Sequence, residues 1–580
     1  MTSRRRFLSS TLAAGAGVPF VALPGPLAEH RVRPGAPPAA PLAAPVDPVT
    51  VEDVERAERV IGLSFRPEQR ALMLDDVNER LESLAAIREA EPPNAVPPAL
   101  TLDLGLSGEA RPPAGPGAVV PALAPRPRPA DDRDLAFASI PELGAMLRSG
   151  AVTAVGLAEF FLDRLERFDP QLQATVTVTR ERALETARAR DAELAAGIDL
   201  GPLHGVPYGA KDLLSARGAP TTWGAEPYRD QTIDEDAAVV EKLEAAGAVL
   251  VAKLTLGALA WGDVWFGGTT KNPWNPDEGA SGSSAGPGAA VAAGLVPFAI
   301  GSETLGSIVS PSTRNGVTGH RPTYGRVPTR GAMALSWSMD KLGPMARSAL
   351  DAALVFDAVR GPDPADAGAP PDPAFPFRPD SDLGRLRVGV LQDAFGAGDG
   401  EGGDADRATL DALRGLGVDL RPVALPDDFP VSALLLILEA EAAAAFDGLT
   451  RSGGVDRMVR QERNAWPNVF RHARLIPAVE YINANRIRTQ LMRAMAALMD
   501  EVDVLVAPSF GNAGLAITNL TGHPAVAVPN GFFPVEGEPE RRRPHSVTFM
   551  GPLWKDHLPL RLAHAYQEAT DFHRRRPPVS

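Results

Sequence analysis

Two turns rich in glycine and serine constrain this chain more than any other feature of its sequence. They occupy residues 280–286, with the sequence ASGSSAG, and residues 301–307, with the sequence GSETLGS. Between them, residues 287–294 predict a short alanine-rich helix ended by glycine, and residues 295–300 predict an apolar strand. The order along the chain is therefore turn, helix, strand and turn, with small hydroxyl side chains that can approach a substrate closely.

Both turns suit acyl transfer. A serine nucleophile needs a base nearby and backbone N–H groups directed at the oxyanion. A loop rich in glycine and serine is, however, more often a flexible or anion-binding turn. Composition alone leaves both interpretations open.

Two short patterns offer other nucleophiles. Residues 282–286 fit G-x-S-x-G, the nucleophile elbow of α/β-hydrolases, which would select Ser284. That elbow follows a buried strand, whereas the preceding residues 272–279 are polar and interrupted by proline. Residues 338–341 fit the S-x-x-K pattern of penicillin-recognising enzymes, but neither S-D-N nor K-T-G follows. We therefore disfavour both patterns.

Lys211 stands out because the chain contains six lysines against 52 arginines. Such a composition would ordinarily supply arginine wherever a surface charge suffices. Arginine stays protonated, whereas the pKa of a desolvated lysine can fall towards neutrality. Residues 206–210 predict a short strand that carries Lys211 at its end. Lys211 is therefore a candidate base, and a solvated surface lysine is the alternative.

Helices and strands alternate through the body of the chain. Thr153 is a candidate cap of a first helix. The other helices are predicted at residues 179–196, 237–246, 431–446 and 478–499, and strands at 248–252, 386–391 and 503–508. This alternation predicts an α/β fold with a sheet covered by helices on both faces.

A longer string of motifs resembles the amidase signature family. It comprises NPWNP at 272–276, GSS at 282–284, AVAAG at 290–294, GSI at 306–308, PTYGRV at 322–327 and DKLGPM at 340–345. The resemblance extends from about residue 131 to the C-terminus. It implies one large domain with a central mixed sheet, and residues 521–525 resemble the stretch that closes that sheet. His523, within that stretch, is expected to be a turn or packing residue.

The resemblance also implies roles for individual residues. Ser307 is the nucleophile, Ser283 is the bridging serine that follows a cis peptide bond, and Lys211 is the base. Neutral Lys211 takes a proton through Ser283 while Ser307 attacks the amide carbonyl. The oxyanion is expected on N–H groups among Thr304, Leu305, Gly306 and Ser307. No cofactor is expected.

The chain departs from the family pattern around both turns. Glu303 replaces aspartate, Leu305 replaces glycine and Val309 replaces arginine, while Ser281 and Ala285 replace two glycines of the first turn. The missing arginine removes an expected ion-pair partner of Glu303, and leucine tolerates positive φ poorly. We therefore expect the oxyanion turn to be built differently.

Composition excludes several classes of function. A formal charge of -14 argues against a nucleic-acid-binding surface. The chain has no cysteine, which excludes disulfides, thiolate metal sites and a cysteine nucleophile. Its nine histidines show no metal-ligand spacing, so we predict no metal.

The first 130 residues are predicted to be separate from the catalytic body at 131–580. Residues 1–28 resemble a twin-arginine export signal, with Arg4 and Arg5 before an apolar stretch. Residues 29–130 predict linkers rich in proline and alanine around a helical segment at 49–91. No later segment has the roughly 18 uninterrupted apolar residues of a membrane span, so no stable membrane insertion is expected after signal removal. We expect a periplasmic or otherwise exported protein.

The sequence therefore predicts an enzyme that hydrolyses a small-molecule amide. An esterase that uses the same serines and a non-catalytic binding protein that keeps the fold are the alternatives. A component of a tRNA amidotransferase, which the family also contains, is disfavoured by the export signal. Pocket walls come from scattered loops that no motif marks, so the substrate is not identified.

Overall fold

The computed structural model describes residues 48–90, 100, 115–120, 123–363, 373–380, 382–396 and 401–579. The predicted export signal and residues 29–47 of the predicted linker lie outside this part of the chain. Residues Val49–Ser580 form one compact unit. None of the helices described here combines the length and the apolar character that crossing a membrane requires.

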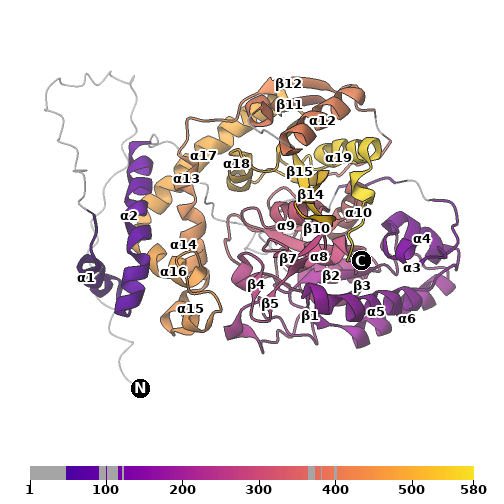
Figure 1. Ribbon diagram of the computed structural model, residues 1–580, viewed down its shortest axis with the longest axis horizontal. Coiled ribbons are helices and arrows are strands. Elements are labelled where there is room, and N and C mark those ends of the chain that lie inside the picture. Colours follow the sequence, from indigo (N-terminus) through magenta and orange to yellow (C-terminus); the bar gives the residue numbers. More distant parts are fainter. Residues whose placement is uncertain are drawn as a thin grey trace, which may run out of the picture. The chain divides into compact units, whose positions relative to one another are not determined.

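An eleven-stranded mixed sheet lies at the centre of this unit (Figure 1). Its strands, in spatial order, are β1 (Thr175–Val178), β3 (Val249–Leu254), β2 (Pro207–Lys211), β8 (Phe298–Glu303), β10 (Lys341–Ala346), β9 (Thr318–Arg321), β14 (Ala525–Val535), β15 (Glu538–Met550), β13 (Val504–Pro508), β11 (Arg387–Leu391) and β12 (Asp419–Val423). Strands β3, β2 and β8 are parallel, as are β13, β11 and β12, and the other neighbours are antiparallel. Every residue of β2, β3, β8 and β10 is buried, as expected for strands covered on both faces.

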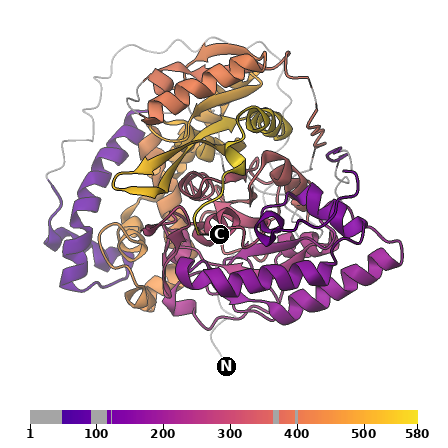
Figure 2. The ribbon, with the colours of Figure 1, turned by 45° about the vertical axis from the view of Figure 1, so that its right-hand side comes forward.

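Two groups of helices cover the sheet (Figure 2). Helices α8 (Ala285–Ala292) and α9 (Val309–Asn315) contact each other, and so do α10 (Ala349–Val359) and α19 (His557–Thr570). Strand β9 contacts both α9 and α10, and β14 contacts both α9 and α19. These contacts place helices on both faces and confirm the predicted α/β fold.

The remaining helices surround this core. They are α1 (Val51–Ile61), α2 (Pro67–Glu89), α3 (Asp132–Ala136), α4 (Ile140–Arg148), α5 (Ala154–Leu172), α6 (Arg180–Ala195), α7 (Ala238–Ala245), α11 (Gln392–Gly396), α12 (Glu401–Gly415), α13 (Val431–Leu434), α14 (Leu436–Ala445), α15 (Asp447–Arg451), α16 (Trp466–His472), α17 (Ala478–Glu501) and α18 (Gly514–Thr521). Thr153 caps α5 as predicted, because its hydroxyl accepts a hydrogen bond from Gly156 N at 2.9 Å.

The helical segment predicted at residues 49–91 consists of two helices. Gly62, at φ 68°, ends α1 in the left-handed conformation that favours glycine. Helix α2 then packs against α13, α16 and α17, and Figure 1 shows it beside these helices. Leu84 and Ile87 of α2 are buried in one apolar cluster with residues of α13, α14 and α17. The segment therefore packs against the body.

One local prediction near the first turn was wrong in detail. The strand predicted at residues 295–300 is β8, which begins at Phe298, after a proline that has no N–H for the ladder. The polar residues before the first turn form a short hairpin, in which β6 (Lys271–Asn272) pairs with β7 (Asn275–Gly279) and most residues of β7 are not buried. This pair is a separate two-stranded hairpin, so the first turn does not follow a strand of the central sheet.

Candidate active site

Lys211 lies at the end of β2, between the parallel neighbours β3 and β8, and its side chain is fully buried. Its Nζ atom lies 2.8 Å from Ser283 Oγ, 3.0 Å from Ser284 Oγ and 2.8 Å from Ser302 Oγ. The carbonyl oxygen of Ser302 lies 3.4 Å away. All of these partners are neutral groups.

The pKa of Lys211 lies well below its ordinary value. Burial is the main cause, because an ammonium loses its hydration there, and the charges of Asp340 and Glu303 oppose the shift only in part. The lowered pKa favours the neutral amine. A neutral amine has a lone pair that can accept a proton from a hydroxyl group.

The first turn brings Ser283 to this amine. The peptide bond between Gly282 and Ser283 is cis, which is what the family resemblance implies. A side chain on residue 282 would lie 1.8 Å from the carbonyl oxygen of Gly262, so the close approach of the two backbones requires glycine. Ser281 N donates to Asp263 Oδ2 at 2.9 Å, and Ser281 Oγ lies 2.7 Å from Ser310 Oγ. These hydrogen bonds fix the first turn to Asp263 and to Ser310 of α9.

The second turn connects β8 to α9 and carries Ser307. The carbonyl oxygen of Ser307 accepts a hydrogen bond from Ser284 N at 3.1 Å, which joins the two turns. Within the described residues, Ser307 Oγ has no hydrogen-bond partner. The same holds for the backbone N–H groups of the turn. These belong to Thr304, Leu305, Gly306 and Ser307. The turn therefore presents a hydroxyl and unpaired donors together.

The left-handed position of this turn is Gly306, at φ 84°, and Leu305 has no positive φ. The expected difficulty of a leucine in the turn therefore does not arise. Thr304 Oγ1 donates to Asp340 Oδ1 at 2.6 Å, and Asp340 also accepts from the N–H groups of Leu335 and Ser336. Asp340 thus ties the start of the turn to the segment before β10.

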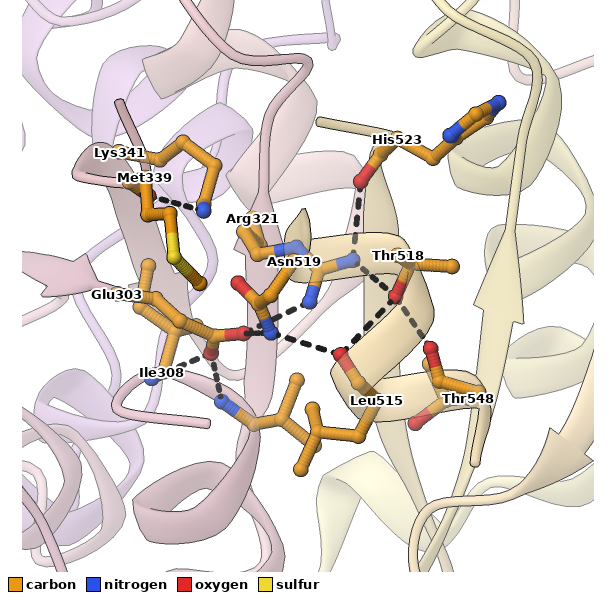
Figure 3. Close-up of polar contacts among 12 residues, drawn as sticks. Glu303, Ile308, Arg321, Met339, Lys341, Leu515, Thr518, Asn519, His523 and Thr548 are labelled. Atoms are coloured by element: carbon orange, nitrogen blue, oxygen red, sulfur yellow. Dashed lines mark hydrogen bonds and ion pairs between the residues drawn. The ribbon is translucent and has the colours of Figure 1, made fainter. Parts of the chain in front are cut away.

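The carboxylate of Glu303 binds the backbone that directly follows the second turn (Figure 3). Its Oε2 atom accepts from Ile308 N at 2.8 Å and Val309 N at 2.9 Å, directly after Ser307. Its Oε1 atom accepts from Arg321 Nη1 and from Asn519 Nδ2, each at 2.7 Å. Burial alone raises the pKa of this carboxyl, but the charge and hydrogen bond of Arg321 outweigh it and bring the pKa to about 2.

Glu303 therefore has an ion-pair partner, although Val309 stands where the resemblance leads one to expect arginine. That partner is Arg321, at the end of β9. Its Nη2 atom also donates to Thr518 Oγ1 at 2.7 Å and to the carbonyl oxygen of His523 at 2.9 Å (Figure 3). The partner is distant in sequence, and no local motif marks it.

His523, Ser284 and the S-x-x-K pair each have hydrogen-bond partners that do not support a role as base or nucleophile. His523 is buried, its Nδ1 lies 2.7 Å from Thr521 Oγ1, and burial lowers its pKa to about 4. Ser284 is also buried, and its hydroxyl donates to the carbonyl oxygen of Ser302 at 3.1 Å. Ser338 Oγ donates to Glu441, whereas Lys341 Nζ donates to the carbonyl oxygen of Met339. Ser338 and Lys341 of the S-x-x-K pattern thus have separate hydrogen-bond partners and do not pair as nucleophile and base.

A cavity of about 780 Å³ opens at the two turns and is lined by the whole stretch from Thr304 to Ser307. Much of its remaining wall is apolar, formed by Trp261, Leu335, Leu435, Leu438, Trp466, Val469, Phe510 and Leu515. Four charged side chains also line it, namely Asp263, Glu278, Arg314 and Glu439. The described residues contain no group of three or more His, Asp or Glu side chains that could hold a metal ion. The cavity can therefore hold a sizeable, largely apolar ligand beside Ser307.

Comparison with known proteins identifies the family. The sequence model of the amidase family matches residues 156–518. A glutamyl-tRNA(Gln) amidotransferase component from Roseiflexus sp. (strain RS-1) is 33% identical over 477 residues, which cover 74% of this chain and 96% of the relative. Its counterpart from Azotobacter vinelandii (strain DJ / ATCC BAA-1303) is 34% identical over 487 residues, which cover 76% and 99%. The structure of native peptide amidase from Stenotrophomonas maltophilia matches with a TM-score of 0.64 and 29% identity, over 76% of this chain and 98% of that protein. The chain therefore belongs to the amidase signature family and is an amidase, an enzyme that acts on amide C–N bonds.

Proposed function

We propose that this amidase hydrolyses a small-molecule carboxylic amide through an acyl-enzyme on Ser307, with Ser283 and Lys211 moving the proton. The observation that carries the proposal is the contact of a fully buried lysine, surrounded by neutral hydrogen-bond partners, with Ser283 Oγ at 2.8 Å. The turn that presents Ser307 lies beside it, joined through Ser284 N.

The hydrogen bonds around Lys211 favour one direction of proton transfer. Ser284 Oγ uses its hydrogen on the carbonyl oxygen of Ser302, so it can only accept from Lys211. A neutral amine that donates to Ser284 and Ser302 keeps its lone pair for the hydrogen of Ser283. Ser283 then takes the proton of Ser307 as its oxygen attacks the substrate carbonyl. The same route returns the proton to the leaving amine, and water releases the acyl group.

The oxyanion is proposed to bind the unpaired N–H groups of the second turn. Removing one such donor typically costs about 2.7 to 4 kcal/mol of transition-state stabilisation, so the shape of the turn contributes as much as the hydroxyl. No cofactor takes part in this reaction. An esterase that uses the same serines is the alternative, since the same groups open an ester.

Labelling and turnover test this function together. A fluorophosphonate should label the purified protein once, and peptide mapping should place the label on Ser307, because the probe reacts with activated serine hydroxyls. A chromogenic anilide and an ester of the same acid then distinguish amidase from esterase. A label on Ser284 would refute the assignment of the nucleophile. Absence of both label and turnover would favour a non-catalytic binding protein.

We also propose that the protein is exported by the twin-arginine route, on the sequence pattern at residues 1–28. Changing Arg4 and Arg5 together to lysine should leave the precursor in the cytoplasm, because the export machinery reads that pair. Cell fractionation with antibody detection measures the distribution. Unchanged delivery of the double variant to the periplasm would contradict the proposal.

A further inference from the structure

One carboxylate in the wall of the cavity at the two turns has no cationic partner. Of the three carboxylates that line this cavity, two belong to ion pairs. Arg314 Nη1 lies 2.6 Å from Glu278 Oε2, and Glu439 pairs with Arg80 of α2. The third carboxylate, Asp263, forms no ion pair with any described residue. The wall therefore keeps one negative charge that no side chain described here compensates.

The fold uses only one oxygen of this carboxylate. Asp263 Oδ2 accepts a hydrogen bond from Ser281 N at 2.9 Å, a contact that an asparagine side chain could accept equally well. Asp263 Oδ1 accepts no hydrogen bond from the described residues, and it does not belong to the buried side-chain atoms that lack a partner. The side chain is half-buried and lines the cavity. Oδ1 is therefore available to a ligand.

The residue before Asp263 offers a second acceptor. Gly262 also lines the cavity, and its carbonyl oxygen accepts no hydrogen bond from the described residues. This oxygen lies against Gly282 of the first turn, where a side-chain carbon would come within 1.8 Å of it. The wall beside the first turn thus presents acceptors, whereas the second turn presents the unpaired N–H donors of residues 304–307. The two sides of the cavity suit opposite parts of a ligand.

Arg460 approaches this wall without neutralising Asp263. Its guanidinium lies over the ring of Trp261, 5.8 Å from the ring centre. Its Nε atom pairs with Glu462 at 2.6 Å, and its Nη2 atom donates to the carbonyl oxygen of Asn464 at 2.6 Å. Arg460 does not line the cavity. A cation that enters the cavity therefore meets Asp263 with its charge still unpaired.

A protonated amine fits these acceptors. An ammonium group carries a positive charge and several N–H donors, so it can bind a carboxylate and a carbonyl oxygen at the same time. A carboxylate on the ligand would be repelled by Asp263. The rest of the wall is largely apolar and would contact the uncharged body of the substrate.

We propose that Gly262 and Asp263 form a subsite for an ammonium group of the substrate, so that the enzyme prefers cationic amides with an otherwise apolar body. This inference rests on the proposed function, because it places the scissile amide at Ser307. Asp263 determines specificity and takes no part in proton transfer. The ammonium group belongs either to the acyl part or to the amine part of the amide, and two pairs of substrates distinguish these positions.

Each pair of substrates differs by one ammonium group. For the acyl part, leucine p-nitroanilide is compared with the p-nitroanilide of 4-methylpentanoic acid, which lacks only the amino group. For the amine part, the N-(2-aminoethyl) and N-propyl amides of 4-methylpentanoic acid are compared. At about pH 7 these amines are mainly protonated. In one of the two pairs, kcat/KM should be at least about 10-fold higher for the ammonium compound, the effect of one charge-assisted hydrogen bond. Asp263→Asn, which keeps an acceptor for Ser281 N, should remove this preference.

Asp277→Asn is the matched control, because Asp277 is an exposed carboxylate of β7 that does not line the cavity. It should keep the preference. Calorimetric binding of the preferred pair to Ser307→Ala protein, with and without Asp263→Asn, measures the same difference without turnover. Equal kcat/KM within both pairs, a preference that survives Asp263→Asn, or an equal loss in the Asp277 variant would overturn the proposal. Absence of turnover of all four amides, together with absence of fluorophosphonate labelling, would instead contradict the proposed function.

Discussion

Replacing Lys211 by arginine is expected to abolish amide hydrolysis as completely as replacing it by alanine. Arginine keeps the positive charge and much of the length, but it stays protonated and cannot accept the proton of Ser283. General acid–base catalysis contributes about 10²- to 10⁴-fold, so both variants should lose at least about 10²-fold in kcat/KM. Steady-state kinetics on one chromogenic anilide measures this loss. Lys555→Arg, at an exposed position, is the control and should retain activity.

The pH dependence separates a base from a structural cation. Burial holds the pKa of Lys211 well below its ordinary value, and protonation removes the lone pair that the reaction needs. The kcat/KM of the unsubstituted enzyme should therefore fall as the pH drops through that pKa. The residual activity of both variants should lack this acidic limb. An arginine variant that restores most of the activity lost in the alanine variant would show that another group accepts the proton.

Burial alone does not distinguish Lys211 from the other lysines of the chain. Lys253 is equally buried, but its Nζ atom bonds to Asp212 at 2.7 Å, so the protonated form has a carboxylate partner. Lys341 is also buried and donates to a carbonyl oxygen, and burial followed by the charge of Arg321 lowers its pKa to about 7. The hydroxyl contacts of Lys211 make it the candidate base. Lysine scarcity in the sequence could not have separated these three residues.

Sequence reasoning predicted the elements that depend on local pattern. Periodicity, caps and ending glycines located helices such as α5 and α6, because these signals lie within a few residues of each other. The family resemblance implied that Lys211 and Ser283 meet, and the structure brings them within hydrogen-bond distance. Their catalytic roles remain predictions that the variants above address.

The contacts that sequence reasoning missed are distant in the chain. Helix α2 looked like part of an appended segment, yet its Arg80 reaches Glu439 across 359 positions. The turn around Gly306 kept its left-handed residue although the neighbouring position changed to leucine. A contact between two residues that are distant in sequence has no fixed spacing along the chain, so a sequence pattern cannot reveal it. Glu303 and Arg321 are the clearest case, because they form an ion pair although they are 18 positions apart and belong to different strands.

Replacing Glu303 by glutamine is therefore expected to damage both stability and catalysis. The carboxylate accepts four hydrogen bonds, two from the N–H groups after Ser307 and two from Arg321 and Asn519. Glutamine has one acceptor oxygen, and its NH₂ group would face two of the four groups that donate to the carboxylate. It also leaves Arg321 buried without its charge partner, which costs about 3 to 5 kcal/mol of unfolding free energy. A displaced oxyanion turn should lower kcat by about 10²-fold.

The difference in unfolding free energy between the unsubstituted protein and the Glu303→Gln variant should also decrease as the pH falls. The folded-state pKa of Glu303 is about 2, below its ordinary value of 4.5. The ionised group therefore stabilises the fold fully above the ordinary value, and this contribution disappears as the pH falls through the folded-state value. Urea unfolding of both proteins between about pH 5 and pH 2 should show the free-energy gap shrinking as the pH falls. Glu462→Gln, which breaks a pair between exposed Glu462 and half-buried Arg460, should change stability by less than about 1 kcal/mol throughout. If the difference in unfolding free energy between the unsubstituted protein and Glu303→Gln stayed constant over this range, the negative charge of the carboxylate would not stabilise the turn. The hydrogen bonds from Ile308 and Val309 would then be independent of that charge.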